Sequence, residues 1–409
     1  MSLKLSLKNK SLWLCLLCFA IASASVGCKQ TLIKKDYARP LKAKSGLRLL
    51  SVYQWPNISN ALTSKKGFNA AAERSLKWFS ISSTQKFFPM DGITHDQARA
   101  SVFAFARLRQ RPGVTPGQIQ AEFNCYTSVG WDGSGDVLFT GYYSPIYKGS
   151  RKRFGKYQYP LYKRPKDLVT DPRTGKILGH PVNGVMTQYP PRKQIQEQQL
   201  LKGTELIWLA NPHEVYNIHV QGSARIDLVD EQKTIFIGYS GNNGHEYKSI
   251  GLLLLKNKAL GDQSLSFTAI QKFFKKHPEQ LKDYTNQNPR FIFFREYPGE
   301  NWPAGSLGFK VSSFRSIATA KTVYPRGGVV LVDTLIAFNK NHKQRIMEFM
   351  LDQDTGGAFK AAGKADIFIG VGHQAEQIAG RQYQEGRLYY FFLKKSRVAY
   401  WLNQMKMER

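Results

Sequence analysis

Two periodicities of apolar residues divide the chain. From residue 58 to residue 122 the apolar residues recur every three or four positions, as at Ala72, Leu76 and Phe79, and residues 95–108 repeat this rhythm. Such spacing places apolar side chains along one face of a helix. We therefore expect this part of the chain to be helical.

Beyond residue 122 the pattern changes to short runs rich in Val, Ile, Phe and Tyr, separated by Gly and Pro. Runs of this kind are typical of strands joined by turns. The predicted strands include residues 137–143, 214–223, 290–295, 328–333, 344–351 and 388–393. Helices are predicted at residues 266–276, 278–286 and 373–379. The sequence thus predicts a mainly β protein with flanking helices.

The predicted strand at residues 214–223 alternates strictly between apolar and polar residues. A strand with this alternation has one buried face and one polar face. The polar face is either ordinary solvent-exposed sheet, which is the commoner case, or the wall of a cleft. It ends at Gln221, Gly222 and Ser223, and this ending favours the cleft.

A second polar run spans residues 238–245. Its Gly, Asn and Tyr residues offer hydrogen-bond donors, hydrogen-bond acceptors and a ring for stacking. This mixture suits the hydroxyl and acetamido groups of sugars. Tyr239, Asn242, Gly244 and His245 are therefore candidate sugar contacts.

Length and charge narrow the class of protein. At 409 residues the chain is long enough for two domains, and its formal net charge of +30 indicates attraction to an anionic partner. Residues 147–193 hold twelve Lys or Arg against Asp167 and Asp171, which is either a solvated rim or a contact surface for an anionic polymer. Because no base-stacking or groove-reading module is found in the sequence, nucleic acid is the least favoured partner.

The N-terminus has the pattern of a secretory signal peptide. Lysines at positions 4, 8 and 10 precede an apolar run from Leu12 to Ile21, which small residues follow. The run is too short to span a bilayer as a stable helix. We expect residues 1–27 to be removed on export.

The signal ends at Ser25-Val26-Gly27-Cys28, which resembles a bacterial lipoprotein cleavage box whose first position is usually Leu. Lipidation of Cys28 is favoured over ordinary cleavage nearby. Lys29 after the cysteine resembles lipoproteins that are sorted to the outer membrane. The predicted location is the periplasmic face of that membrane, with residues 28–44 as a tether.

Cysteine and histidine usage predicts neither disulfides nor metal. Cys125 is the one cysteine left after the signal and Cys28, which excludes a disulfide framework. The eight histidines lack the spacing of metal ligands. We expect no cofactor.

Two carboxylates stand twelve residues apart near the C-terminus. Asp354 begins an Asp-Thr-Gly-Gly turn, and Asp366 is flanked by Ala365, Ile367 and Phe368. Apolar neighbours disfavour the charged form of a carboxyl group. A carboxylic acid that stays protonated near neutral pH can donate a proton to a leaving group. The local pattern supports equally an alternative in which Asp354 caps a turn and Asp366 ends a strand.

An ordered series of short blocks resembles the membrane-bound lytic murein transglycosylase A family. The blocks are Phe139–Pro145, Tyr159–Tyr162, Val220–Ser223, Tyr239–Gly251, Asn288–Phe294 and Asp354–Gly380. Each block alone is weak, whereas the ordered set is specific. Together they extend over residues 45–395, which is nearly the whole exported chain.

The resemblance implies a double-psi β-barrel with a second β-rich domain inserted into it and a groove between them. On this basis the barrel combines residues 45–145 with residues 290–395, and the insertion spans residues 146–289. Residues 396–409 are expected to be a C-terminal tail.

The resemblance also implies an activity: cleavage of the β-1,4 bond between N-acetylmuramic acid and N-acetylglucosamine in peptidoglycan, which leaves a 1,6-anhydro end. The family's catalytic acid matches Asp366. Its second barrel aspartate matches Asp354, which we expect to organise loop backbone through hydrogen bonds. The expected substrate contacts are Tyr142, Gln221, Gly222, Ser223, Tyr239, Asn242, Gly244 and His245.

One departure from the family pattern stands at Ala320, where related barrels usually carry a third aspartate. If that aspartate is structural, repacking or a contact of the neighbouring Lys321 would replace it; if it tunes the site, activity would be altered. Two alternatives therefore stay open: a glycoside hydrolase that uses both aspartates, and a wall-binding lipoprotein without catalysis.

Overall fold

The computed structural model describes residues 35–41, 45–172, 175–261 and 267–408. The predicted signal peptide and Cys28 lie outside these residues. Within them, no helix has both the length and the apolar character needed to span a membrane.

One sheet closes into a barrel. Strands β17, β14, β15, β13, β16 and β3 pair in that order, and β3 pairs again with β17. Strands β1 (Leu47–Leu49) and β2 (Phe123–Ser128) extend the sheet beyond β17. The barrel strands are β3 (Val137–Ser144), β13 (Ser316–Ala318), β14 (Val329–Ala337), β15 (Lys343–Asp354), β16 (Lys364–Val371) and β17 (Tyr383–Leu393).

Apolar residues on both faces of β14 explain why this barrel strand is buried on its inner and its outer side. Val329, Val330, Leu331 and Val332 are all fully buried. β-Branched residues suit the pleated backbone, and burial on both faces gives an uninterrupted apolar run rather than an alternating one. The strand predicted at residues 328–333 is confirmed.

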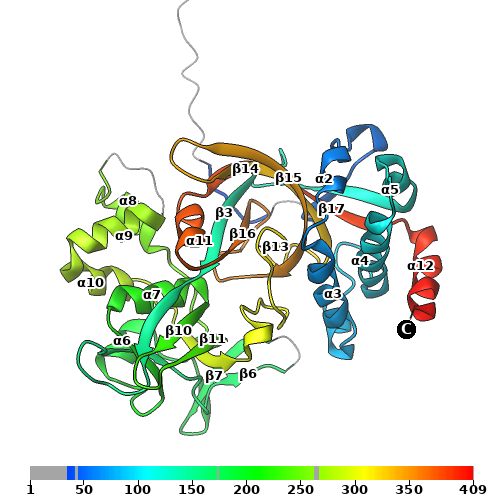
Figure 1. The fold of residues 1–409 in the computed structure, drawn as a ribbon. Helices are drawn as coiled ribbons and strands as arrows, with labels where there is room; N and C mark the ends of the chain where they lie inside the picture. The colour runs from blue at the N-terminus through cyan, green and yellow to red at the C-terminus, as the bar shows by residue number, and fades with distance from the viewer. Residues whose placement is uncertain (1–34, 42–44, 173–174, 262–266, 409) are drawn as a thin grey trace, which may run out of the picture. The chain divides into compact units, whose positions relative to one another are not determined.

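Helices pack against one side of the barrel (Figure 1). Helix α4 (His95–Gln110) begins at Thr94, whose side chain accepts a hydrogen bond from the Gln97 backbone NH, as expected of an N-cap. The Gln97 side chain donates to the carbonyl of Leu393 on β17 at 2.7 Å. The other helical elements here are η1 (Val52–Gln54), α2 (Ser59–Thr63), α3 (Phe68–Phe79), η2 (Ser82–Phe87) and α5 (Pro116–Glu122). The helices predicted between residues 58 and 122 are confirmed.

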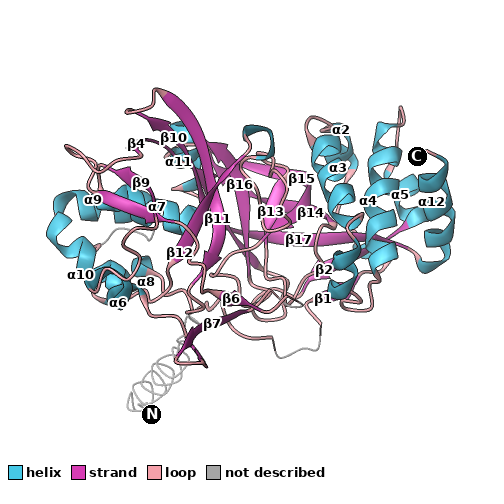
Figure 2. Ribbon diagram, turned by 90° about the horizontal axis from the view of Figure 1, so that it is seen from below, coloured by secondary structure: helices cyan, strands magenta, loops and turns pink. Residues whose placement is uncertain are grey.

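The predicted C-terminal tail is instead a helix, α12 (Lys395–Met407). It lies beside α4, as Figure 2 shows, and the rings of Trp401 and Phe103 meet edge to face at 6.2 Å. Trp401 also donates from its indole nitrogen to Glu122 at 2.8 Å. Burial of Trp401 and Met405 explains why this segment is part of the fold.

The chain leaves the barrel after β3 and builds a second sheet with the strand order β12-β11-β10-β4-β9-β5. A bridge between Lys163 and Phe294 brings the end of β5 next to β12. The strands are β4 (Ile146–Ser150), β5 (Tyr159–Tyr162), β9 (Glu205–Leu209), β10 (Ser223–Leu228), β11 (Lys233–Asn242) and β12 (Ile292–Tyr297). The second sheet therefore extends past the predicted domain boundary at residue 289, and the chain re-enters the barrel at β13.

Smaller elements complete the insertion. A three-stranded sheet is formed by β6 (Val169–Thr170), β7 (Ile177–Val182) and β8 (Val185–Thr187). The helical elements are α6 (Arg192–Glu197), α7 (Pro212–Gln221), α8 (Ile250–Lys256), α9 (Phe267–Lys276), η3 (Pro278–Gln280) and α10 (Leu281–Asn286). Two more, η4 (Gly299–Asn301) and α11 (Gly372–Ala379), follow the second sheet. The architecture is thus the predicted one, mainly β with a barrel and a β-rich insertion.

The strand predicted at residues 214–223 is wrong, because this segment forms helix α7. The Asn211 side chain caps the helix by accepting from the His213 NH at 2.8 Å, and Pro212 occupies the first turn. Gly222 ends the helix with φ at +82°, a conformation that glycine adopts readily. These start and stop signals outweigh the two-residue alternation.

The burial of α7 explains the misleading pattern. The polar residues Asn217 and His219, which were assigned to an exposed face, are buried together with Tyr216 and Ile218, whereas Val220 is 40% exposed. Asn217 donates to the hydroxyls of Tyr143 and Tyr147 at 2.8 and 2.7 Å. Because this helix carries polar residues on its packed faces, its sequence lacks a simple apolar stripe.

Candidate active site

Asp366 lies in the middle of β16, with its side chain 18% exposed to solvent. The Thr140 hydroxyl on β3 donates a hydrogen bond to its Oδ1. The Lys364 ammonium lies 3.6 Å from the same oxygen. The carboxylate is therefore reachable from solvent and is held by one hydroxyl and one cation.

The residues that flank Asp366 in sequence are not its surroundings in space. Ala365 and Ile367 are fully buried and belong to the barrel core. Because successive side chains of a strand point to opposite faces, these two lie across the strand from the carboxylate, and Phe368 alone shares its face. The expectation that all three apolar neighbours press on Asp366 is wrong for this reason.

Strand register brings the two aspartates close together. Ala318 on β13 pairs with Asp366 on β16 and also with Asp354 at the end of β15. Neighbouring strands are about 4.8 Å apart, so the two aspartate Cα atoms are separated by roughly 10 Å across a single alanine. Ala318, which pairs with both, lies between them on β13.

A β-bulge sets the direction of Asp354. Ile317 pairs with Asp352, whereas the next residue, Ala318, pairs with Asp354, so Gln353 is the extra residue. Without the bulge, Asp352 and Asp354 would point to the same face of β15. Bulges are frequent next to active sites because they re-aim a side chain. Here the bulge leaves the Asp352 carboxylate in the core and places the Asp354 carboxylate at the site.

Asp354 is a half-buried acid that is hydrogen-bonded to backbone. Its Oδ1 accepts hydrogen bonds from the backbone NH groups of Ser306 and Thr355, both at 2.8 Å. Burial raises the pKa of Asp354, and these hydrogen bonds, Tyr142 and the charge of Lys321 oppose the rise. The loop hydrogen bonds expected from the sequence are present.

Tyr142 lies next to Asp354 on the face of β3 that carries Thr140. Its hydroxyl is buried and has no hydrogen bond of good geometry within the described part of the chain. Burial, and then the charge of Asp354, raise the pKa of Tyr142 well above its usual value. The ring therefore carries a neutral phenol, which can donate a hydrogen bond.

Three of the predicted substrate contacts join the insertion to the barrel. The Gln221 side chain accepts from the Tyr143 NH at 3.1 Å, and the hydroxyls of Ser223 and Ser144 are 2.7 Å apart. Gly222 lies between them as the end of α7. These contacts fasten the last residues of β3, the strand that also carries Thr140 and Tyr142.

The other predicted contacts lie around the end of β11 and bond to one another. Asn242 donates to the Tyr239 hydroxyl at 2.6 Å and accepts from the Gly244 NH at 2.8 Å. His245 reaches the Tyr189 carbonyl at 2.7 Å. Tyr239 is 44% exposed.

Tyr247 was not singled out from the sequence, although it lies in the block Tyr239–Gly251. Burial is the main cause that raises its pKa, and the charge of Asp366 is a further one, so the two residues are close. A side chain at Gly357 would come within 3.2 Å of the Tyr247 Cβ and 3.0 Å of the Arg290 Nε. Glycine at this position therefore lets the loop after β15 approach Tyr247.

A salt bridge joins the same two loops. The Lys360 ammonium and the Glu246 carboxylate are 2.9 Å apart. The loop after β11, which belongs to the insertion, thus meets the barrel loop that Asp354 begins. Both parts of the protein contribute residues near the two aspartates.

The position of the missing aspartate is occupied by a different arrangement. Ala320 is fully buried, and the neighbouring Lys321 forms a buried ion pair with Asp352. The Lys321 ammonium also donates to the Thr319 hydroxyl at 3.0 Å, and the Tyr390 hydroxyl donates to Asp352 at 2.8 Å. A Lys321 contact was one of the expected outcomes, whereas Asp352 was not identified from the sequence.

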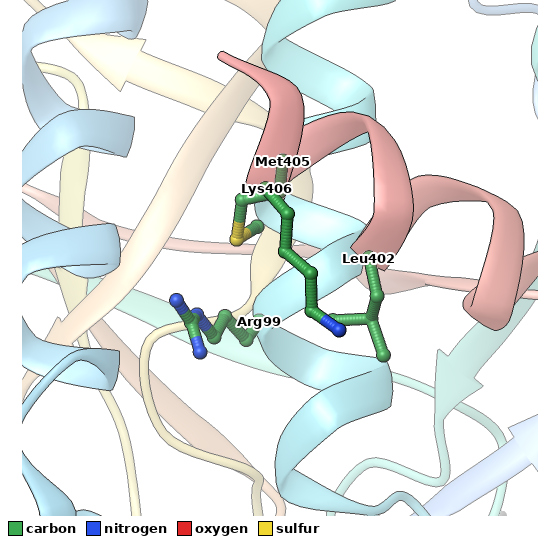
Figure 3. A pocket seen from close by; sticks show the side chains of 4 residues that line it. All are labelled: Arg99, Leu402, Met405 and Lys406. Atoms are coloured by element: carbon green, nitrogen blue, oxygen red, sulfur yellow. The ribbon is translucent and has the colours of Figure 1, made fainter. Parts of the chain in front are cut away.

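Two hollows in the described part of the chain lie on helices rather than at the aspartates. One of about 100 Å³ is lined by Arg99, Leu402, Met405 and Lys406, between α4 and α12 (Figure 3). The other is lined by Lys65, Asn69, Arg109 and Gln110. No group of three His, Cys, Asp or Glu side chains suited to a metal ion is found among residues 35–408 as described.

Two family models match the chain. The MltA specific insert domain matches residues 138–295, and the 3D domain matches residues 315–392. The first match covers the second sheet, and the second covers the barrel strands that carry Asp354 and Asp366.

Two curated relatives each match about two thirds of this chain. The membrane-bound lytic murein transglycosylase A of Escherichia coli K12 is 29% identical over 281 residues, which is 68% of this chain and 71% of the relative. The protein of the same name from Vibrio cholerae is 27% identical over 274 residues, 65% of this chain and 68% of the relative.

Solved structures share the fold. A membrane-bound lytic murein transglycosylase from Agrobacterium tumefaciens aligns with a TM-score of 0.69 at 21% identity, over 87% of this chain and 99% of that one. Escherichia coli MltA with bound chitohexaose aligns with a TM-score of 0.65 at 23% identity, over 88% and 99%. The lytic transglycosylase LtgG of Burkholderia pseudomallei is 28% identical with a TM-score of 0.50, over 88% and 99%.

Proposed function

Because the chain belongs to the membrane-bound lytic murein transglycosylase A family, we propose that it cleaves the β-1,4 bond between N-acetylmuramic acid and N-acetylglucosamine and leaves a 1,6-anhydro end. The observation that carries this proposal is the position of Asp366. It is a solvent-reachable carboxylate on a barrel strand, hydrogen-bonded to Thr140 and close to Tyr247 of the insertion. Both matched modules therefore contribute to its surroundings.

In the proposed reaction Asp366 acts twice. As an acid it donates its proton to the glycosidic oxygen while the bond from that oxygen to C1 of the muramic acid breaks. As a carboxylate it then accepts the proton of the C6 hydroxyl, whose oxygen attacks C1. Protons and bonds balance without water, and Asp366 ends the cycle protonated.

Asp354 has a different task in this scheme. Its Oδ1 accepts hydrogen bonds from the NH groups of Ser306 and Thr355. A general base in a hydrolase must hold a water molecule, and an inverting pair needs space for that water between its carboxyl groups. These contacts favour Asp354 as an organiser of the loops over the two-aspartate hydrolase.

Two tyrosines among the expected substrate contacts offer groups that a sugar can use. The Tyr142 phenol is a neutral donor beside Asp354, and the Tyr239 ring is exposed. We propose that the first donates to a sugar oxygen and that the second stacks on a sugar ring. The Escherichia coli relative holds chitohexaose in its structure, and a glycan chain is the corresponding ligand here.

The wall glycan is also the expected partner of the positive charge. Removal of residues 1–27 takes away three lysines and no acid, so the formal charge falls from +30 to +27. Peptidoglycan carries lactyl and peptide carboxylates, which a chain of this charge attracts. We propose that Cys28 anchors the protein by a lipid to the periplasmic face of the outer membrane. Mass spectrometry of the N-terminal peptide from purified membranes tests this anchor, and an unmodified cysteine would contradict it.

The catalytic assignment is tested by Asp366→Asn on purified sacculi. Loss of the proton donor should lower the rate of muropeptide release by about 10²–10⁴-fold, as for removal of a general acid. Binding of the variant to sacculi, measured by sedimentation, should stay at the level of the unmodified protein. Release of anhydro-ended products at the unmodified rate would refute the role of Asp366.

A further inference from the structure

We propose that the buried ion pair of Lys321 and Asp352 is a positioning device for the site, which replaces the carboxylate absent at position 320 and keeps Asp354 aimed towards Asp366. This inference deepens the proposed function and rests on it. Neither residue touches substrate in the scheme above. Both act through the backbone that carries the site.

The pair is enclosed by protein. The Asp352 side chain is 0% exposed and the Lys321 side chain 4%. Asp352 accepts hydrogen bonds from Thr319 at 2.7 Å and from Tyr390 at 2.8 Å. The donors to the Asp352 carboxylate therefore come from two parts of the barrel: the residues after β13 and strand β17.

Thr319 connects the ion pair to the site. Its hydroxyl bonds to Asp352, while its backbone NH donates to the Asp354 carbonyl at 3.1 Å. Its own carbonyl accepts from the Thr355 hydroxyl at 2.7 Å. Thr319 thus contacts both sides of the bulge, so a shift of the ion pair would displace the backbone of Asp354.

Gln353, the extra residue of the bulge, is held by hydrogen bonds on the opposite side. Gln353 accepts from the Ser316 hydroxyl at 2.6 Å and donates to the Ala71 carbonyl on α3 at 2.7 Å. Asp352 contacts Lys321, and Gln353 contacts α3 on the opposite side. These opposed contacts stabilise the bulge. Ala318 then stands between Asp354 and Asp366 in register.

Stability alone does not account for such a pair. Removing two charges from water is costly, and apolar replacement of a buried pair is often neutral or stabilising. An apolar pair would therefore serve the core equally well. The geometry that an apolar pair cannot reproduce is the hydrogen-bonded link through Thr319 to Asp354.

The test compares two double variants that each remove one ion pair from the barrel. Lys321→Met with Asp352→Leu removes the buried pair. Arg345→Met with Asp333→Leu removes an exposed pair of 2.8 Å that joins β14 to the same strand, β15. Melting temperatures identify the temperature at which both variants are folded, and kinetics on sacculi are measured there.

We expect the buried-pair variant to lose kcat by at least about tenfold with KM within about twofold, since displacement by about 1 Å can cost 10²-fold in rate. Hydrogen exchange provides a readout apart from catalysis. The Thr319 amide should lose protection in this variant and keep it in the control. The control should retain both kcat and KM.

Two results would overturn the inference: a folded buried-pair variant with unchanged kcat, or a control variant that loses as much. If the double variant fails to fold, Asp352→Asn takes its place, because it keeps hydrogen-bonding groups for Thr319 and Tyr390 and leaves Lys321 without a counter-charge. Unchanged kcat and Thr319 protection in this folded variant would overturn the inference equally. An unmodified protein that releases no muropeptides would refute the proposed function instead, and the hydrogen-exchange comparison would still decide the positioning claim.

Discussion

At the scale of single residues, the two aspartates differ in what surrounds them. Both are half-buried, but Asp366 contacts a hydroxyl and an ammonium group, whereas Asp354 is bonded to backbone NH groups. Carboxylates placed in such different environments take different roles in glycan-cleaving enzymes. The structure therefore supports different roles for the two aspartates: Asp366 exchanges protons, and Asp354 holds loops in place by hydrogen bonds.

The burial of Asp354 predicts a trade-off between stability and activity. Because burial raises its pKa, the ionised form costs free energy in the folded state. This cost is absent below the usual pKa of an aspartate and grows as the pH rises through the raised value. Asp354→Asn should therefore stabilise the protein at pH 7, by roughly 0.5–2 kcal/mol, while lowering activity.

Urea unfolding of Asp354→Asn and the unmodified protein, at pH 7 and again near pH 3, measures this effect. The stability difference should be present at the higher pH and nearly vanish at the lower one. Equal differences at both pH values would show that the charge of Asp354 is not the cause.

The sequence predicted Asp354 and Asp366 as site residues because both stand in one recognisable block. The structure places them on strands that flank β13. Asp352 was overlooked because it lies inside an apolar strand run, where an acid has no partner in the local sequence. Its partner, Lys321, is 31 residues away and meets it through strand pairing. Long-range pairs of this kind leave no local signal.

At the scale of elements, helix α7 shows how end signals can decide a structure. Its residues alternate as a strand would, yet Asn211, Pro212 and Gly222 supply the start and the stop of a helix. The helix also connects the two sheets, since Gln221 and Ser223 bond to the end of β3. Loosening α7 should thus affect the whole fold.

The cap of α7 gives a direct prediction. Asn211→Ala removes the acceptor for the His213 NH and should destabilise the protein by about 1 kcal/mol. Asn211→Asp keeps an acceptor oxygen and is the matched control. Thermal unfolding of the two variants measures the difference, and equal melting temperatures would show that the cap contributes nothing.

The bulge in β15 is an element that the sequence did not predict. Residues 344–351 read as a regular strand, and the strand was correctly expected, but the break at Gln353 depends on contacts with Ser316, α3 and Thr319. Such contacts come from distant parts of the chain. The direction of Asp354 could therefore not be derived from alternation along its own strand.

At the scale of the whole molecule, the division into a barrel and a β-rich insertion was predictable, because the ordered blocks extend over residues 45–395. The closure of the barrel through β3 and β17 and the end of the insertion after β12 came from strand pairing. Pairing between strands that are far apart in sequence is not encoded in the local pattern of either strand.

The net positive charge predicts that binding to the cell wall depends on salt concentration. Exposed charges are screened within about 10 Å at 0.1 M salt, so binding that depends on the net positive charge should weaken as salt rises. Sedimentation of Asp366→Asn with sacculi over a series of NaCl concentrations measures binding without digestion of the wall. Affinity that does not change with salt would remove charge as the cause of wall association.

The central claim is that the muramic acid's own hydroxyl, and not water, completes the cleavage. The most direct measurement is digestion of purified sacculi in water enriched in oxygen-18, followed by mass spectrometry of the released muropeptides. The account predicts anhydro-ended products, lighter by one water than reducing-end products, with no heavy oxygen at C1. Reducing ends that carry the heavy oxygen would show that water attacks and would contradict it.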